Sequence, residues 1–268
     1  MIQLQRNRTS QAILAKYTMP TLLKWEQELI DMAKLVSNNK TPYSFKEDYW
    51  KAAKQQLVAE SFGKCAYCEA PTNTVAHGDV EHFRPKSRYW WLAYCYDNYL
   101  YACQICNQKF KGNEFPVKGT RWAGPNPAAV AAGALGVDPL AGPVVFNTFL
   151  QTSAQEQADL PNPYYVDPEP FFIWRADDVL KEVEILPNPA HPDAARVHQA
   201  VEQYYGLNRK ELRGLRYQAY AKFEVLKLAS KLTTLSAQVA SKVAVQVQQS
   251  KMPEAWFAGM NRYFDTII

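Results

Sequence analysis

Apolar residues recur at helical spacing near the start of the chain, between residues 21 and 36. The positions that share this stripe are Leu22, Leu23, Trp25, Leu29, Ile30 and Leu35. The spacing predicts an amphipathic helix with one buried face. A second helix is expected from Ser44 to about Glu60, because Ser44 and Glu47 have the spacing of a capping box.

The last third of the chain has the same helical periodicity. The helices expected there span residues 194–205, 208–229, 231–249 and 254–265. Gly206 is placed to end the first of them as a C-cap, and Asn208 is placed to begin the second as an N-cap. Pro253 suits the first turn of the last helix.

Shorter elements are expected between these two helical regions. Residues 74–83 have an extended pattern that Pro85 interrupts, residues 94–103 lead into a short strand, and residues 106–111 begin a helix. Residues 121–163 differ, because they are rich in Ala, Gly and Pro and carry almost no charge. A loop of this length is usually functional or disordered. Its apolar content favours a segment that covers a site or docks a partner.

The patterns predict an α+β protein that is mostly α-helical. They divide the chain into a helical segment, a motif-bearing segment, an apolar insertion and a helical C-terminal region, which span residues 1–62, 63–120, 121–163 and 164–268. The length of 268 residues and the hydrophobic content of 47% are typical of a globular protein with a real core.

No apolar run approaches the roughly 20 residues that a membrane helix needs. The N-terminus also lacks the apolar stretch of a signal peptide, so we expect a cytoplasmic protein with no membrane partner. The net charge of +4 is unevenly distributed, with 16 Lys and Arg against 11 Asp and Glu in residues 1–120 and 14 against 15 in residues 121–268. This excess favours a polyanionic partner for the first half of the chain.

Four of the five cysteines form two short pairs, Cys65 with Cys68 and Cys103 with Cys106. Two such turns supply the four thiolates of a tetrahedral zinc site, and in a reducing compartment this spacing indicates a metal more often than a disulfide. A redox pair or buried thiols are the alternatives, but neither explains why both pairs flank one polar motif. A zinc ion with four sulfur ligands has no open position, so it is expected to be structural. The fifth cysteine, Cys95, is expected to be a small buried residue.

The polar motif between the cysteine pairs runs from Asp79 to Ser87 and reads DVEHFRPKS. Glu81 and His82 are adjacent in it, so on a regular strand their side chains point to opposite faces unless a turn intervenes. Pro85 leaves room for such a turn. By itself a Glu-His pair usually marks a surface strand, and a histidine that merely caps the zinc-held loop is the alternative for His82.

Residues 79–87, Asn98 and residues 103–113 together resemble the ββα-metal HNH endonucleases. The text VEHFRPKS…CNQKFKGNEFP is similar to one branch of them, the bacterial HNH proteins encoded beside an ATPase in anti-phage defence, as in Septu systems and some retrons. The match is specific over residues 63–117 and looser over residues 162–216. This resemblance implies a zinc-stabilised, treble-clef-like ββα-metal module embedded in a helical protein.

The resemblance also implies a role for each polar residue of the motif. His82 takes the place of the general base that removes a proton from the attacking water. Glu81 and Asn107 take the places of ligands to one divalent cation, Mg²⁺ or Mn²⁺, which prefers oxygen ligands as zinc prefers thiolates. Asn98 takes the place of the residue that orders the loop behind the base, and Asp79 supports the metal or orients His82. Asn107 stands where many members have His, a substitution that occurs in active members of the family.

Basic residues flank the motif and are candidates for contacts with phosphate groups. They are Arg84, Lys86, Arg88, Lys109 and Lys111. Contact is favoured for Arg84 and Lys86, whereas without the motif a solvated basic face would be the better interpretation. The aromatic residues between positions 89 and 101 are expected mostly to pack around the zinc module.

The resulting hypothesis is an HNH endonuclease that hydrolyses phosphodiester bonds in nucleic acid, as the effector of an anti-phage defence complex with an ATPase subunit. Double-stranded DNA is the first expected substrate and RNA, including tRNA, is the second, because no residue of the motif reads base edges or a 2′-hydroxyl. The competing class is a non-catalytic, zinc-held module that docks an ATPase or nucleic acid. In that class the Glu81-His82 pair is incidental.

Overall fold

The computed structural model describes residues 1–38, 41–74, 76–135, 140 and 143–268. Over these residues the chain is a mostly helical α+β protein with two small antiparallel sheets of two strands each, which confirms the predicted class. Contacts group the chain into two compact units, one of residues 1–4, 61–77 and 161–268 and the other of residues 5–60 and 78–160. This grouping does not test the four-part division expected from composition, which stays a prediction. No helix within the described ranges is long and apolar enough to cross a membrane.

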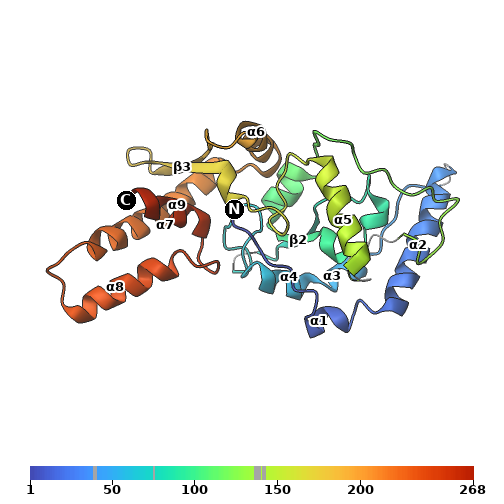
Figure 1. The fold of residues 1–268 in the computed structure, drawn as a ribbon, viewed down its shortest axis with the longest axis horizontal. Helices are drawn as coiled ribbons and strands as arrows, with labels where there is room; N and C mark the ends of the chain where they lie inside the picture. The colour runs from blue at the N-terminus through green and yellow to red at the C-terminus, as the bar shows by residue number, and fades with distance from the viewer. Residues whose placement is uncertain (39–40, 75, 136–139, 141–142) are drawn as a thin grey trace. The chain divides into compact units, whose positions relative to one another are not determined.

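The unit of residues 5–60 and 78–160 contains the whole polar motif of residues 79–87. Its helices are α1 (Gln11–Leu14), α2 (Met19–Ser37), α3 (Glu47–Lys51), α4 (Lys54–Glu60) and α5 (Pro143–Glu156) (Figure 1). The helix predicted for residues 21–36 is confirmed as α2, which buries Leu22, Trp25, Leu29 and Ile30. The prediction is wrong for Leu23 and Leu35 of the stripe, which are exposed. The short turn η1 (Trp90–Leu92) packs against α2.

The single helix predicted from Ser44 to Glu60 is wrong, because α3 and α4 are separate helices. The residue before α3 is Lys46, and no side chain caps this helix. The backbone N–H of Lys46 donates instead to the Tyr94 hydroxyl at 2.8 Å. The helix therefore begins after Lys46, whose backbone amide is satisfied by a distant tyrosine, and not after Ser44 as the capping-box pattern predicted.

The sheet of this unit pairs β1 (Asp79–His82) with β2 (Tyr99–Ala102) in antiparallel register. The turn η2 (Tyr96–Asn98) leads into β2, and η3 (Ile105–Lys111), a helical segment with π-type hydrogen bonds, follows it. The predicted order of strand, strand and short helix is therefore confirmed, although both strands are shorter than the predicted extended segments.

The apolar insertion of residues 121–163 is not a loop throughout, because it contains α5. Phe149 of α5 is 1% exposed, and the Glu156 carboxylate is fully buried, where it accepts hydrogen bonds from Arg84 Nε and the Tyr89 hydroxyl, both at 2.6 Å. Residues 136–139 and 141–142 of the insertion lie outside the described part. The Ala, Gly and Pro content concealed the helix, since its anchoring partners are far away in the sequence.

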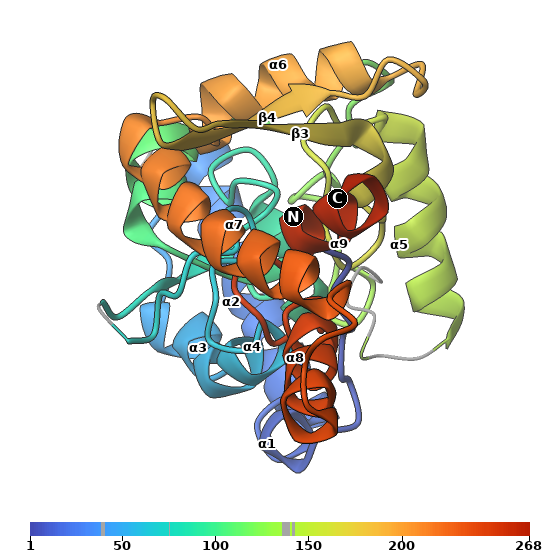
Figure 2. The same cartoon turned by 90° about the vertical axis from the view of Figure 1, so that its left-hand side faces the viewer.

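The other unit contains a hairpin that the sequence did not predict, inside the region expected to be only helical. Its strands are β3 (Phe172–Asp177) and β4 (Glu182–Pro187). Figure 2 shows the hairpin between α6 (Ala194–Tyr205) and α7 (Lys210–Ser230), which both pack against β4. The signal was the alternation in β4, where Val183 and Ile185 are fully buried.

The remaining helices of this unit are α8 (Ala237–Gln249) and α9 (Ala258–Ile267), and η5 (Glu169–Phe171) precedes the hairpin. The C-cap at Gly206 is confirmed, because this residue has φ +60° after α6. The N-cap of α7 is Arg209 and not Asn208, while α8 and α9 begin later than predicted. In Figure 1, α8 returns alongside α7.

Candidate active site and metal centre

The register of β1 and β2 sets the position of the Glu-His pair. Glu81 lies opposite Leu100, and His82 lies opposite Tyr99 at the end of the ladder. Both side chains are buried, Glu81 at 4% and His82 at 6% exposed. The pair is therefore not part of a surface strand, and each polar side chain requires a partner.

The His82 ring is held by its surroundings on several sides. Its Nε2 lies 2.9 Å from the carbonyl oxygen of Ala93, and its edges meet Trp50 and Tyr99 with centroids 5.0 and 5.1 Å away. A carbonyl only accepts, so Nε2 carries the hydrogen and donates it, which leaves the lone pair on Nδ1. Burial lowers the pKa of His82 to about 3, and the charge of Lys86 acts in the same direction. The ring is consequently neutral at pH 7, the protonation state that a general base needs.

Glu81 has an ammonium partner in the same unit. Lys111 Nζ lies 2.5 Å from Glu81 Oε1 and donates to the backbone carbonyl of His82 at 3.0 Å. Lys111 is 1% exposed. The last turn of η3 is thus tied to both members of the Glu-His pair.

Asn107 and Asp79 are brought together across η3 and β1. Asn107 Nδ2 donates to Asp79 Oδ2 at 3.0 Å, and Gln108 Nε2 donates to the same oxygen at 2.8 Å. Because the amide nitrogen of Asn107 is turned to Asp79, its Oδ1 is the atom that it offers to a cation. The sequence interpretation did not assign Gln108 to this group.

Asn98 is fully buried and links two segments near His82. Its Oδ1 accepts from the backbone N–H of Arg84 at 2.9 Å, and its Nδ2 donates to the carbonyls of Arg84 and Leu92 at 3.0 and 3.3 Å. The amide therefore holds the chain immediately after β1 against the loop that carries the Ala93 carbonyl.

A pocket of about 260 Å³ opens beside these residues. Its lining consists of Val80, Glu81, His82, Pro85, Lys86, Asn107, Gln108, Gly112 and Asn113. The structure thus brings the expected base and both expected cation ligands to one cavity, with a lysine in its wall. Asn98 and Asp79 support this wall from outside the lining.

The basic residues of the motif occupy different environments. Arg84 is 2% exposed and pairs with Glu156 at 2.6 Å, so like Lys111 it is engaged inside the protein. Lys86 lines the pocket with Nζ 4.9 Å from the Trp50 ring, and burial lowers its pKa against the opposing charge of Glu81. The exposed members are Arg88 and Lys109. Only these last two and Lys86 are placed for a ligand that approaches from solvent.

The four paired cysteines form one cluster. One ligand atom from each of Cys65, Cys68, Cys103 and Cys106 lies within 4.8 Å of the others. Four sulfurs at this separation match the donor set of a tetrahedral zinc site, so the cluster is compatible with a structural Zn²⁺. This donor set fits the metal predicted from the spacing.

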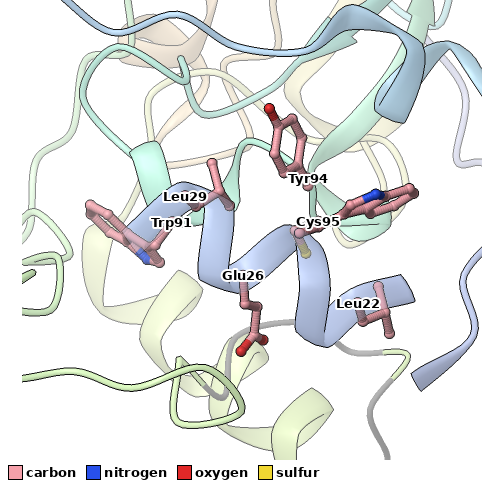
Figure 3. Close-up of a pocket in the computed structure, with 7 residues that line it drawn as sticks. Leu22, Glu26, Leu29, Trp91, Tyr94 and Cys95 are labelled. Atoms are coloured by element: carbon pink, nitrogen blue, oxygen red, sulfur yellow. The ribbon is translucent and has the colours of Figure 1, made fainter. Parts of the chain in front are cut away.

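Cys95 is not in this cluster. Figure 3 shows it facing α2 beside Leu22, Glu26 and Leu29, in a pocket of about 20 Å³. A space of this size holds no more than about one water molecule. Cys95 is 2% exposed and packs as the small buried residue that was expected.

Comparison with known proteins adds one relationship. No family model and no solved structure matches the chain. Among curated proteins it is similar to Septu protein PtuB of Bacillus mycoides (strain KBAB4), at 34% identity over 106 residues. Over this segment the chain is a distant homologue of PtuB. The segment covers 34% of the chain and 36% of PtuB, so the chain spans about a third of the length of the curated relative that it matches.

The sequence predicted a resemblance to the Septu branch, and the 34% identity to PtuB over 106 residues confirms it. The sequence interpretation missed Trp50, Glu156 and Ala93, which hold the ring of His82 or the side chain of Arg84. No motif could identify them, because they are 32, 72 and 11 positions away from their partners or offer only a backbone carbonyl. Lys111 was expected to contact phosphate and not to pair with Glu81. Its spacing of about one helical turn from Asn107 was a sequence signal that it lies on the same side of η3 as the site.

Proposed function

We propose that this protein is a metal-dependent endonuclease that hydrolyses phosphodiester bonds in nucleic acid. The observation that supports the proposal is the shared pocket of Glu81, His82 and Asn107, in a chain that is similar to Septu protein PtuB over part of its length. In the PtuB-like setting the protein would act as the effector of an anti-phage defence complex with an ATPase.

His82 is assigned the role of general base. Its Nε2–H is committed to the Ala93 carbonyl, so Nδ1 takes the proton from the attacking water. Asn98 fixes the loop on which this carbonyl lies, through its bond to the Leu92 carbonyl. Trp50 and Tyr99 limit rotation of the ring, so the base keeps one orientation.

Glu81 and the Oδ1 of Asn107 are assigned as the ligands of one Mg²⁺ or Mn²⁺, with Asp79 orienting Asn107. Both ligand residues line the pocket and offer the oxygen donors that these cations prefer. A bound divalent ion supplies neutralisation of the scissile phosphate and stabilisation of the leaving oxygen. Lys86 is assigned to a neighbouring phosphate, with Arg88 and Lys109 as outer contacts.

The first test is cleavage of plasmid DNA and of total tRNA in Mg²⁺ or Mn²⁺, with and without a candidate ATPase partner. We expect cleavage by the wild type to be abolished by EDTA and reduced at least about 100-fold in His82→Ala. His198→Ala is the matched control, because His198 Nε2 also bonds a backbone carbonyl, that of Ile185, at 2.9 Å but lines no part of the pocket. The substrate that is cut identifies DNA or RNA, and cleavage by His82→Ala at the wild-type rate contradicts the assignment.

A second candidate function is a zinc-held module that docks an ATPase or nucleic acid without catalysis. The burial of His82 and the ion pair of Glu81 with Lys111 favour it, because such groups also serve folding alone. If the wild type cuts neither substrate in any condition, yet carries zinc and binds its partner, this second function replaces the first.

The apolar insertion of residues 121–163 and the helical C-terminal third are the expected contact surfaces for the ATPase, and the insertion is tested first. A deletion that tests it must spare α5, because Glu156 and Phe149 anchor the core of their unit. We expect replacement of residues 124–135 by a short Gly-Ser linker to weaken the complex on a sizing column and to leave the zinc content unchanged. An unchanged complex contradicts this assignment.

A further inference from the structure

The corner between α6 and α7 is fixed from both sides. Gly206 ends α6 in the left-handed region, and the backbone N–H of Arg209 donates to the Gly206 carbonyl at 3.2 Å. The Asn208 side chain exchanges two hydrogen bonds with the backbone of Ile185 in β4, at 2.9 and 2.8 Å. Arg209, at the N-cap of α7, therefore starts from a backbone position with little freedom.

The guanidinium of Arg209 reaches a cysteine of the four-sulfur cluster. Its Nη2 donates to Cys68 Sγ at 3.6 Å, a normal length for an N–H···S hydrogen bond. Its Nη1 donates to the Gly206 carbonyl at 3.0 Å, which holds the other arm of the fork. The planar guanidinium of Arg209 is thus held to the α6–α7 corner through Nη1 and donates to the sulfur through Nη2.

The turn that carries Cys68 packs against the same corner. The rings of Tyr67 and Tyr205 stack with centroids 3.8 Å apart and planes 15° apart. Within the turn, the Glu69 N–H donates to the Cys65 carbonyl at 3.0 Å. Cys68 is 2% exposed, so its sulfur cannot receive the same hydrogen bond from bulk water.

Charge explains why a cation is needed there. A zinc ion with four thiolates has a net charge of about −2, and burying that charge is costly unless it is compensated. A second guanidinium, that of Arg216, is 1% exposed in the same unit and donates to the Leu207 carbonyl of the corner at 2.6 Å. Burial lowers the pKa of Arg216 to about 10, and the negative charge of Cys68 opposes this shift.

We propose that Arg209 is a positioning residue of the zinc site, which tunes the Cys68 thiolate by hydrogen bonding and retains the metal. Hydrogen bonds from surrounding groups to metal ligands typically change metal affinity 10- to 100-fold when removed. The role rests on the cluster holding zinc and is independent of nuclease activity. It also connects residues 205–216, which lie in the looser part of the match and have no catalytic assignment, to the four-cysteine cluster.

The test compares the zinc-loaded full chain with Arg209→Met, Arg209→Lys and Arg213→Met. Arg213 is the matched control, because it lies one turn further along α7 and pairs with Glu184 and Glu182 instead of sulfur. The first readout is the rate of zinc transfer to a chelating dye at constant pH. We expect transfer at least about 10 times faster in Arg209→Met than in the wild type and Arg213→Met, with an intermediate rate in Arg209→Lys.

A second readout separates sulfur tuning from a merely structural role at the corner. In the cobalt-substituted protein, loss of an N–H···S bond makes the thiolate a stronger electron donor. We therefore expect the sulfur-to-cobalt charge-transfer band to move to longer wavelength in Arg209→Met and to stay in place in Arg213→Met. If the band and the zinc transfer rate of Arg209→Met both equal those of the wild type, the proposal is overturned.

Two further outcomes are decisive. A wild-type chain that purifies with no zinc and takes none up overturns the proposal whatever its cleavage activity. If Arg209→Met does not fold, Arg209→Lys decides, because it keeps the charge and loses the fork: a wild-type band and rate in that variant overturn the hydrogen-bond role.

Discussion

The sheet of β1 and β2 and the sheet of β3 and β4 are both antiparallel pairs, but they bury different chemistry. The first pairs four residues on each strand, and it buries Glu81 and His82 with a partner for each. The second pairs six residues on each strand, buries Trp174 and Ile185, and leaves its charged pairs at the surface. A ladder that buries charge requires tertiary partners in fixed positions, whereas one that buries apolar side chains requires only a complementary surface.

The two sheets also differ in how well the sequence predicts their strands. In β4, buried and less buried residues alternate regularly, which is the pattern of a half-buried strand. β1 buries two consecutive polar residues at its end, which contradicts the simple pattern. Sequence-level expectations fail most often where function imposes such an exception.

The largest expected effect comes from breaking the buried pair of the first sheet. Lys111→Met leaves the Glu81 carboxylate buried without its ammonium partner, so we expect the free energy of unfolding to fall by about 4 kcal/mol. Urea unfolding at pH 7 measures it. The control is Lys109→Met, an exposed lysine on the same segment, with an expected change below about 0.5 kcal/mol.

The double variant Glu81→Gln, Lys111→Met sharpens this test. We expect it to be more stable than Lys111→Met alone, because no unpaired charge remains buried. Equal stability of the two variants would mean that Lys111 acts through its bond to the His82 carbonyl and not through the ion pair.

In the second sheet, the largest loss of stability is expected from removing a buried apolar side chain. Ile185 is fully buried between the hairpin and the helices that cover it, so Ile185→Ala is expected to lower the free energy of unfolding by about 3 kcal/mol. Val179→Ala is the control, since Val179 is 90% exposed in the hairpin loop. The comparison would be wrong if Ile185→Ala lowered the free energy of unfolding by no more than Val179→Ala, because burial of apolar side chains would then not stabilise the second sheet.

A smaller effect distinguishes the two sheets without disrupting either: the contribution of His82 in the first sheet to the free energy of unfolding depends on pH. The pKa of His82 is about 3 in the folded chain and about 6.5 when unfolded. Between these values the unfolded chain binds a proton that the folded chain does not, so stability falls as the pH drops below about 6.5. The slope from this group is at most about 1.4 kcal/mol per pH unit.

The measurement is the difference in unfolding free energy between wild type and His82→Gln from pH 7.5 to 5.5. Protonation of other groups occurs in both proteins and cancels in the difference. We expect the wild type to lose more stability than the variant over this interval. Parallel curves would show that the His82 ring is accessible to protons in the folded chain.

The smallest effect is expected from the exposed pair of the second sheet. Arg175 Nη2 lies 2.6 Å from Glu184 Oε2, but the arginine side chain is 66% exposed and solvent screens the interaction. Arg175→Met should change the unfolding free energy by less than about 0.5 kcal/mol. A loss comparable to that of Lys111→Met would remove the contrast between the two sheets.

Much of the fold was predictable where a local pattern decides the structure. The helical periodicity of α2 and the C-cap Gly206 are properties of consecutive residues, and both were predicted correctly. The start of α3 at Glu47 was not predictable, because the hydroxyl of Tyr94 satisfies the amide of Lys46 from 48 residues away. The helix α5 was hidden for the same reason, since Glu156 is stabilised by Arg84 and Tyr89.

The candidate site divides in the same way. The sequence by itself determined which chemical groups the chain offers, because the spacing of four cysteines and the order of Glu81, His82 and Asn107 can be read directly from it. Only the tertiary structure decided which charged side chains are engaged inside the protein. Arg84 and Lys111 are as basic as Lys86 in the sequence, but each is buried against a carboxylate that no local pattern could assign to it. The physical reason is that a buried charge is stable only beside its partner, and folding, not spacing, brings the partners together.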